Sequence, residues 1–303
     1  MERVAVIYNP VAGRGRALGL AKLVEQRLMD SGARPEVLPT KAAGDAFRMA
    51  SEFDEGIQRA FIVGGDGTLR EAAGGVLEAG GHVALAHIPL GNANVVAREL
   101  GVPLDAKAAV DVLMGGHAEA FDVLDVQGHL VLAMVGVGYD AKLAAGMDWA
   151  RSGVGKAWYR FHGDSLYGVV GALCLMDPSQ RRYALIADGQ ELQGDFTGCI
   201  VSNMHTYAKG WAPNPGADPQ DGELDYQALK PGWMPSTAIS LVAAARRKRL
   251  PQALAAHGRA TELVIRSRTP FHWQADGDAM GRTPELRIRV RPQVLNLVVP
   301  AKG

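Results

Sequence analysis

Short apolar runs alternate with amphipathic stretches along the first part of the chain, which is typical of strands and helices that build a mostly parallel sheet. The apolar runs predict strands near residues 3–8, 36–39, 60–63 and 83–88. The amphipathic stretches predict helices near residues 15–31, 44–54, 68–79, 93–100 and 105–114. We therefore expect an open α/β domain over residues 1–120.

After residue 120 the pattern changes to strands of alternating apolar and polar positions joined by hairpin-like turns such as Gln127-Gly128. It predicts strands near residues 121–126, 130–135, 181–187, 191–203, 223–229, 260–267 and 270–275. Two helical insertions are expected, within 140–176 and over 235–257. We expect a β-rich second domain over 121–289, and the β-like end of the chain, 290–303, to be able to return to the first domain.

The length of 303 residues is enough for two domains. Lys and Arg together number 32, as do Asp and Glu, so the whole molecule has no net attraction for nucleic acid or for an anionic bilayer. Any basic surface must be local. One basic cluster, Arg246-Arg247-Lys248-Arg249, lies in the second insertion and reads either as a solvated helix face or as a contact for anionic lipid head groups.

The two cysteines, Cys174 and Cys199, lie in apolar contexts without the spacing of metal ligands or of a disulfide framework. They read as core residues of a reduced protein, and the chain opens on a strand pattern with no export signal. We therefore expect a cytoplasmic protein.

The clearest chemical signal is the turn Gly64-Gly65-Asp66-Gly67-Thr68, which follows an apolar run and precedes a helical pattern. Glycines let backbone N–H groups approach an anion, and the N-terminal end of the next helix carries partial positive charge. Asp66 adds a carboxylate suited to a metal ion or a hydroxyl. By itself the turn is equally compatible with a strand-to-helix connection that needs glycine only for its geometry.

Three other polar loops follow predicted strands of the same sheet. Asn9 follows the first strand, Thr40 ends the second, and Gly91-Asn92-Ala93-Asn94 follows the fourth. The carboxyl ends of parallel strands share one edge of an open sheet, and ligands bind at that edge. The four loops together indicate a nucleotide site.

At these loops the chain resembles the diacylglycerol kinase catalytic-domain superfamily, which includes sphingosine and ceramide kinases and bacterial soluble lipid kinases. The family's Asn-Pro-x-x-Gly is similar to residues 9–13, and its Gly-Gly-Asp-Gly-Thr with a downstream Glu is similar to 64–68 and Glu71. The family's Pro-x-Gly-Thr-x-Asn-Asp-x-Ala-Arg is similar to residues 89–98.

Two later acidic segments extend the resemblance. Residues 221–225 resemble the family's structural magnesium loop, and Asp276-Gly277-Asp278 resembles its late acidic turn. Because Gly-Gly-Asp-Gly-Thr also occurs in NAD kinases and phosphofructokinases, these two segments are what favour the lipid-kinase branch.

The resemblance implies an N-terminal nucleotide-binding α/β domain, a C-terminal β-sandwich domain and an active site in the cleft between them. It implies an ATP- and Mg²⁺-dependent lipid kinase that transfers the γ-phosphate to a hydroxyl of a diacylglycerol-like or sphingoid lipid. It also implies the residues that hold the nucleotide: Asn9, Thr40, Gly64, Gly65, Asp66, Gly67, Thr68, Leu69, Arg70, Glu71, Gly91, Asn92 and Asn94.

Phosphoryl transfer needs charge neutralisation and a carboxylate that accepts the proton of the acceptor hydroxyl. The resemblance gives Asp66 the role of holding or orienting magnesium, and it gives the base role to Asp276 or Asp278 without choosing between them. Asp122 and Asp140 are further candidates for the magnesium network, and a strand-end turn or cap explains them equally well.

A second, structural magnesium ion is implied at Asp218, Asp221 and Glu223, a loop rich in oxygen ligands. The alternative for this loop is an acidic turn without a metal.

Three functions stay open. The first is the lipid kinase, which would meet its substrate by transient, peripheral contact with the inner face of a membrane. The second is a soluble-substrate kinase of the NAD-kinase type. The third is a nucleotide- or lipid-binding regulatory protein without turnover, which Asn92 favours because the family usually has Thr there. Val95, where many members have Asp, indicates instead a subfamily with a different lipid acceptor. We expect no nucleic acid partner, and a homodimer is compatible with the sequence.

Overall fold

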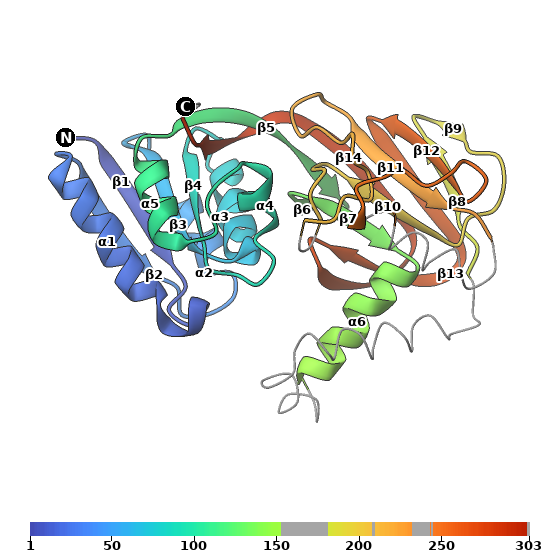
Figure 1. The fold of residues 1–303 in the computed structure, drawn as a ribbon, viewed down its shortest axis with the longest axis horizontal. Coiled ribbons are helices and arrows are strands. Elements are labelled where there is room, and N and C mark those ends of the chain that lie inside the picture. The colour runs from blue at the N-terminus through green and yellow to red at the C-terminus, as the bar shows by residue number, and fades with distance from the viewer. Residues whose placement is uncertain (153–180, 208–209, 232–242, 244, 302–303) are drawn as a thin grey trace. The chain divides into compact units, whose positions relative to one another are not determined.

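The computed structural model describes residues 1–152, 181–207, 210–231, 243 and 245–301 (Figure 1). The chain divides into two compact units. Unit 1 comprises Met1–Val123, Ala208–Gly210 and Arg291–Gly303, and unit 2 comprises Leu124–Tyr207 and Trp211–Val290. The boundaries that the sequence predicts, at residues 120 and 290, lie close to these divisions.

Unit 1 contains a parallel sheet with the strand order β2-β1-β3-β4. Its strands are β1 (Arg3–Tyr8), β2 (Arg34–Pro39), β3 (Ile57–Gly64) and β4 (Ala84–Pro89). β4 is buried along its whole length, as are the last five residues of β3. Because helices cover both faces of a parallel sheet, its central strands read as unbroken apolar runs, which is why the sequence locates them well.

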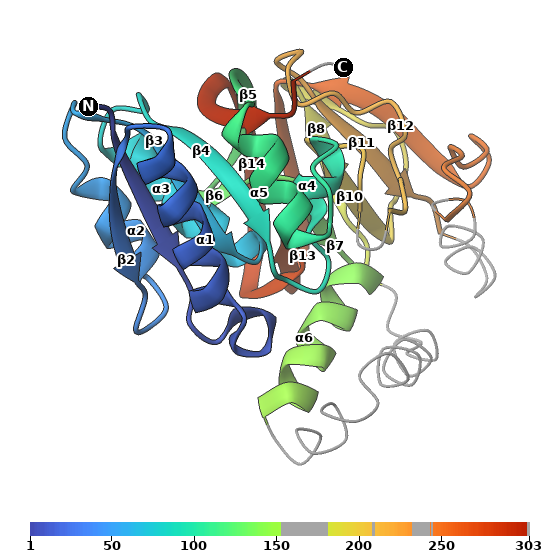
Figure 2. The ribbon, with the colours of Figure 1, turned by 60° about the vertical axis from the view of Figure 1, so that its left-hand side comes forward.

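The helices of unit 1 are α1 (Ala17–Asp30), α2 (Asp45–Ser51), α3 (Asp66–Glu78), α4 (Val95–Glu99) and α5 (Ala106–Met114), with a 3₁₀ turn η1 (Ala12–Gly15) before α1. Figure 2 shows α1 and α5 on the same face of the sheet, where Val24 and Val110 share one core cluster. α2 packs on α3 at Gly75, where a Cβ atom would lie 2.2 Å from the carbonyl oxygen of Phe47.

Two strands, β5 (His117–Val126) and β14 (Asp278–Val299), contain residues of both units. The other strands of unit 2 are β6 (His129–Val131), β7 (Met134–Val137), β8 (Ala184–Ala187), β9 (Gln190–Glu191), β10 (Gly198–Ser202), β11 (Leu224–Leu229), β12 (Ala255–Ala260) and β13 (Glu262–Ala275). Five of these strands, β12, β11, β10, β7 and β13, pair antiparallel in that order.

β13 changes partners along its length and so connects two layers of a sandwich. Its N-terminal part pairs with β8 at residues 263–266, and its C-terminal part pairs with β7 at 273–275. The register with β14 shifts between Arg266 and Phe271, where the strand bends. The sequence predicts two strands here, over 260–267 and 270–275, whereas the backbone continues as one bent strand.

Other predicted elements of unit 2 also differ from the structure. The strand expected over 130–135 is split into β6 and β7, and the strand expected over 191–203 is split into β9 and β10. The hairpin turn at Gln127-Gly128 is confirmed, since the two residues have φ of +54° and +86°.

The helical insertions are described only in part. α6 (Tyr139–Ser152) opens the first, and the rest of that expected segment, residues 153–176, lies outside the described residues together with Cys174. The second was expected to reach residue 257, but β12 begins at Ala255 and the basic cluster Arg246–Arg249 lies in a turn and coil. Cys199 is in the core of unit 2, where burial raises the pKa of its thiol.

None of the helices in the described parts of the chain is long and apolar enough to cross a bilayer.

The contact at Gly75 gives a stability prediction with a matched control. Gly75→Ala should lower the free energy of unfolding by about 1–3 kcal/mol, because the added methyl group overlaps the backbone of α2. Gly19 is also inside a helix, is exposed and has no atom within 4 Å of a Cβ position. Gly19→Ala should therefore raise stability by about 0.5–1 kcal/mol. Urea unfolding measures both, and equal effects would contradict the close packing of α2 on α3.

Candidate functional site

The strand order of unit 1 reverses between β1 and β3. The chain passes from β1 to β2 on one side and then returns to β3 on the other, so the loops after β1 and β3 leave the sheet toward opposite faces. In open α/β sheets ligands bind at such a point, at the carboxyl ends of the strands. The backbone N–H of Asn9, after β1, donates to the carbonyl of Val63 in β3 at 3.1 Å. The predicted loops therefore meet at the switch point.

The neighbouring loops are tied to the same edge by backbone hydrogen bonds. The N–H of Thr40 donates to the carbonyl of Tyr8 at 2.9 Å, and the N–H of Leu90 donates to that of Gly64 at 2.8 Å. Thr40 is 9% exposed, and the side-chain oxygen of Asn9 accepts from the N–H of Val11 at 3.2 Å.

Close packing at the 64–68 turn and the 91–94 loop leaves little room for side chains at Gly64, Gly65 and Gly91. A Cβ atom on Gly64 would lie 2.8 Å from the Cβ and Oγ1 atoms of Thr68. A Cβ atom on Gly91 would lie 2.9 Å from the Cα of Gly65, so the two loops touch through their backbones. Geometry therefore explains Gly64, Gly65 and Gly91 without a ligand.

Gly67 is different. It lies in the first turn of α3, is exposed, has no positive φ and has no atom within 4 Å of a Cβ position. The N–H groups of a helix's first turn have no partner in a preceding turn, so their partial positive charge points out of the end of the helix. The open space at Gly67 is therefore where backbone N–H groups of this turn can meet an anion.

Asp66 and Asn94 connect the 64–68 turn to the 91–94 loop. Asp66 is the first residue of α3, two residues before the predicted start, and its Oδ1 accepts from the N–H of Val96 at 3.3 Å. The Asn94 side chain accepts from the N–H of Gly91 at 2.8 Å and donates to the carbonyl of Gly91 at 3.0 Å. Asn94 thus holds the loop in its conformation, with its own φ at +48°. Asn92 is exposed.

The remaining predicted nucleotide residues lie on α3. Leu69 is completely buried, so its side chain belongs to the core, whereas Arg70 and Glu71 are half-buried.

His87 is a residue of this site that the sequence analysis missed. It lies in the middle of β4, is 1% exposed, and its Nε2 lies 3.2 Å from the carbonyl oxygen of Gly64. Burial lowers the pKa of His87, although Asp66 and the Gly64 carbonyl act in the opposite direction. The ring is therefore neutral, and its contact with the Gly64 carbonyl supports the start of the 64–68 turn. Its only signal in the sequence is a histidine within an apolar strand.

In unit 2, the carboxylate of Asp276 is held by backbone. Its Oδ1 accepts from the N–H groups of Ala133 at 2.8 Å and Met134 at 3.1 Å, and its Oδ2 accepts from that of Leu132 at 3.0 Å. These bonds explain why β6 and β7 are separated at 132–133. Asp278 begins β14 and is exposed.

A half-buried carboxylate, that of Asp140, connects α6 to this acidic turn. Asp140 accepts from the hydroxyl of Tyr207 at 2.7 Å and from Nε2 of Gln274 at 2.6 Å, and Oε1 of Gln274 accepts from the N–H of Gly277 at 2.8 Å. Burial raises the pKa of Asp140, while the two hydrogen bonds act against that shift. A Cβ atom on Gly136 would lie 2.0 Å from Asp140 Oδ2, so only glycine at this position of β7 leaves room for the network.

Asp122, in unit 1, accepts from the backbone N–H of Gln293 at 2.8 Å. Gln293 has a φ of +49°, so this bond supports a bend in β14. The contact favours the structural alternative that the sequence leaves open for Asp122.

The predicted structural metal loop contains a guanidinium group. Arg259 pairs with Asp221 and, at 2.9 Å, with Glu223, while Asp218 and Asp221 each accept a backbone N–H of their own loop. Within the described residues no group of three or more His, Cys, Asp or Glu side chains is arranged to hold a metal ion. Arg259 thus partly neutralises the acidic side chains of this loop, and the structural magnesium ion, for which one carboxylate with backbone carbonyls would be enough, stays a prediction.

The burial of His87 gives a pH prediction. A histidine whose pKa is lower in the folded than in the unfolded chain stabilises the fold above the unfolded value, about 6.5, and loses that contribution as the pH falls below it. Urea unfolding between pH 7.5 and 5 should show a slope from this group of at most about 1.4 kcal/mol per pH unit. His87→Gln, which keeps a donor for the Gly64 carbonyl, should have a flatter profile. An identical profile in the variant would contradict the assignment.

Comparison with known proteins agrees with the two-part organisation. Residues 3–126 match the model of the diacylglycerol kinase catalytic domain, and residues 133–299 match the YegS C-terminal NAD kinase beta sandwich-like domain. These matches confirm the predicted fold class, an α/β domain followed by a β-sandwich-like domain.

Individual relatives extend over nearly the whole chain. A Pseudomonas aeruginosa protein named as a YegS-like lipid kinase is 30% identical over 276 residues, covering 90% of this chain and 87% of its own. A diacylglycerol kinase of Staphylococcus carnosus is 24% identical, covering 93% and 90%. A crystal structure of a diacylglycerol kinase from Bacillus anthracis superposes with a TM-score of 0.72 at 20% identity, covering 98% and 97%. The chain therefore belongs to the diacylglycerol kinase catalytic-domain superfamily and is a kinase of the lipid-kinase type.

Proposed function

We propose that this protein is an ATP- and Mg²⁺-dependent lipid kinase that phosphorylates a hydroxyl of a diacylglycerol-like or sphingoid lipid. The observation that carries the proposal is the open N-terminal turn of α3 at Gly67, which packing does not explain and which an anion would fill. The family match makes a nucleotide phosphate the natural occupant.

The nucleotide side of the reaction belongs to unit 1. Backbone N–H groups at the start of α3 bind phosphate oxygens, and Asn9 and Thr40 line the same sheet edge. Mg²⁺ is held in proteins by one or two carboxylates together with substrate phosphates, and Asp66 at this helix start fits that description. When bound, the ion supplies charge neutralisation at the transferring phosphate.

The acceptor side belongs to the Asp276-Gly277-Asp278 turn. One of these carboxylates takes the proton of the lipid hydroxyl. The three N–H bonds to Asp276 favour its ionised form and fix its orientation. Asp278 is exposed. Gln274 holds the turn between them through Gly277.

The choice of a lipid acceptor rests on the relatives, which are named as lipid or diacylglycerol kinases. A second candidate is a soluble acceptor of the NAD type, which the description of the C-terminal domain as NAD kinase-like favours. An assay with labelled ATP and Mg²⁺ distinguishes the two. Transfer to diacylglycerol or sphingosine in mixed micelles supports the proposal, and transfer to NAD alone overturns it.

Gly67 gives a specific test of the phosphate site. Gly67→Val should fold normally, because its side chain meets no neighbour, and it should weaken ATP binding at least tenfold by covering the N–H groups. Thermal unfolding measures the first effect and calorimetric titration with ATP measures the second. Gly19→Ala, also in an open helix position, serves as the control. Unchanged affinity in Gly67→Val would place the phosphates elsewhere.

Substitution of the two acidic residues of the late turn, Asp276 and Asp278, should affect the free energy of unfolding differently. Asp276→Asn should lower the free energy of unfolding by about 1–3 kcal/mol, because an amide group cannot accept all three N–H bonds. Asp278→Asn should change stability by less than about 0.5 kcal/mol. We expect lipid phosphorylation to fall in both variants. Loss of kcat in Asp278→Asn at unchanged stability and unchanged KM for ATP identifies Asp278 as the base, loss confined to Asp276→Asn excludes Asp278, and full activity in both would overturn the assignment to this turn.

A further inference from the structure

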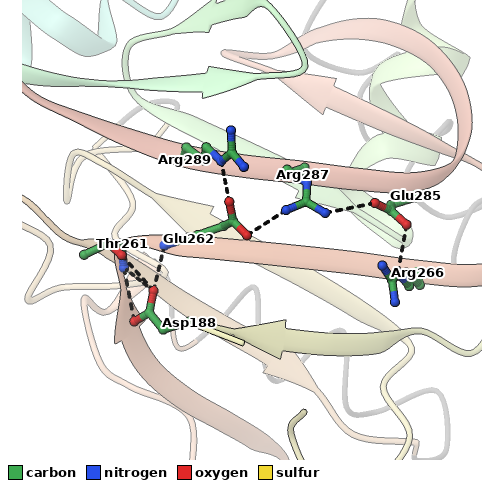
Figure 3. Close-up of polar contacts among 7 residues, drawn as sticks. All are labelled: Asp188, Thr261, Glu262, Arg266, Glu285, Arg287 and Arg289. Carbon is green, nitrogen blue, oxygen red and sulfur yellow. Dashed lines mark hydrogen bonds and ion pairs between the residues drawn. The ribbon is translucent and has the colours of Figure 1, made fainter. Parts of the chain in front are cut away.

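A row of alternating charges covers the outer face of the sheet formed by β13 and β14 in unit 2. Figure 3 shows Arg289 and Arg287 on either side of Glu262, and Arg287 and Arg266 on either side of Glu285. The pairs are cross-strand neighbours, because Glu262 is opposite Arg289 and Arg266 is opposite Glu285 in the register. We call these five residues the ion-pair ladder. Along it each cation has an acidic neighbour.

Beyond Arg266, arginines outnumber acidic residues. A cavity of about 680 Å³ opens there. Among its described lining residues are four arginines and one acidic residue, Arg181, Arg182, Arg266, Arg268 and Asp195. Arg266 is paired with Glu285 at 2.8 Å, and Arg182 is paired with Asp195.

Two of the arginines have no acidic partner among the described residues. Arg181 donates to the carbonyl oxygen of Pro270, which also accepts from Arg282 at 3.0 Å, so a second cation lies beside the first. Arg268 is exposed, and no hydrogen bond or ion pair holds it within the described part of the chain. The cavity thus gathers positive charge in a chain whose total charge is zero.

The same charges act on His272. It is half-buried on β13, and burial together with Arg282, Arg181 and Lys142 lowers its pKa. Like charges brought together in this way reduce stability, and natural sequences retain such local conflicts mainly at functional sites. Ser267 and Thr269 add hydroxyl groups to the same wall.

We propose that this arginine-lined cavity binds the phosphate of an anionic phospholipid head group and so holds unit 2 at a membrane surface. Guanidinium groups match phosphate oxygens in charge and geometry, and the cavity is large enough for a head group. None of the described lining residues is among those proposed for phosphate transfer, and binding here requires no ATP.

The basic cluster Arg246–Arg249 is a weaker choice for the same role. Its last arginine lies 3.6 Å from Asp225, and Arg247 also has a partner. In the cavity, by contrast, Arg268 is available.

Sedimentation of the full-length chain with vesicles tests the proposal. Binding should be stronger to phosphatidylglycerol and phosphatidylcholine mixtures than to phosphatidylcholine alone, and it should weaken with salt. Arg268→Gln should reduce binding about fivefold and Arg268→Glu further, at unchanged thermal stability, because the side chain has no partner to lose. Arg34→Gln, at an exposed arginine of unit 1, should bind like the wild type.

Two outcomes contradict the proposal, and a third supports its distinction from the reaction. Equal vesicle binding by wild type and Arg268→Glu would remove the cavity from the membrane contact. Stabilisation of the wild type, but not of Arg268→Glu, by glycerol phosphate in solution without any vesicle binding would make the ligand a soluble phosphate ester. Loss of vesicle binding with intact lipid phosphorylation in micelles would separate this site from the proposed reaction.

Discussion

The candidate nucleotide site depends on a contact between two stretches of backbone that leaves no room for side chains. Gly65 and Gly91 approach closely enough that a Cβ atom on Gly91 would lie 2.9 Å from the Cα of Gly65. This contact brings the start of α3 next to the start of α4. It lets Asp66 accept a hydrogen bond from Val96 and lets Asn94 close its own loop on Gly91. The site is therefore held in place by its own backbone before any ligand binds, which reduces the entropy cost of ordering it.

Unit 2 uses carboxylates for the same purpose. Asp276 binds three N–H groups between β6 and β7, and Asp140 binds the side chains that hold the other side of the same turn. Gly136 gives Asp140 the space it needs on the neighbouring strand. A turn held from both ends keeps its remaining acidic side chain, Asp278, in a defined position. Here a residue can be essential to the site through the backbone that it orders, which is why loss of activity alone does not identify a base.

The sequence predicts the parallel strands of unit 1 and the loops at their ends because buried strands are continuous apolar runs followed by glycine or polar residues. It places the start of α3 two residues late, because glycines weaken the helical pattern at 64–67. It divides β13 into two strands, 260–267 and 270–275, because a local pattern does not show that the bent strand continues between them. The acidic loop near Asp221 suggests a metal, because its neutralising Arg259 is 38 residues away along the chain and no local pattern connects them. His87 is hidden for a related reason: a buried polar residue becomes informative only when its partner, the Gly64 carbonyl, is known.

Although the chain has no net charge, the charged side chains of one sheet are paired in the ion-pair ladder and, among the described residues, unpaired at Arg268. In the ion-pair ladder, Glu262 and Glu285 lie between arginines, so each charge is compensated within a few ångströms and the face gains cross-strand contacts without a net field. At Arg268 the same alternation has no acidic residue to continue it. Exposed ion pairs contribute little to stability, so the ladder is not what holds the sandwich together. Its effect is to confine uncompensated positive charge to one end of the face, and a local field of that kind selects for anions there while the rest of the surface stays neutral.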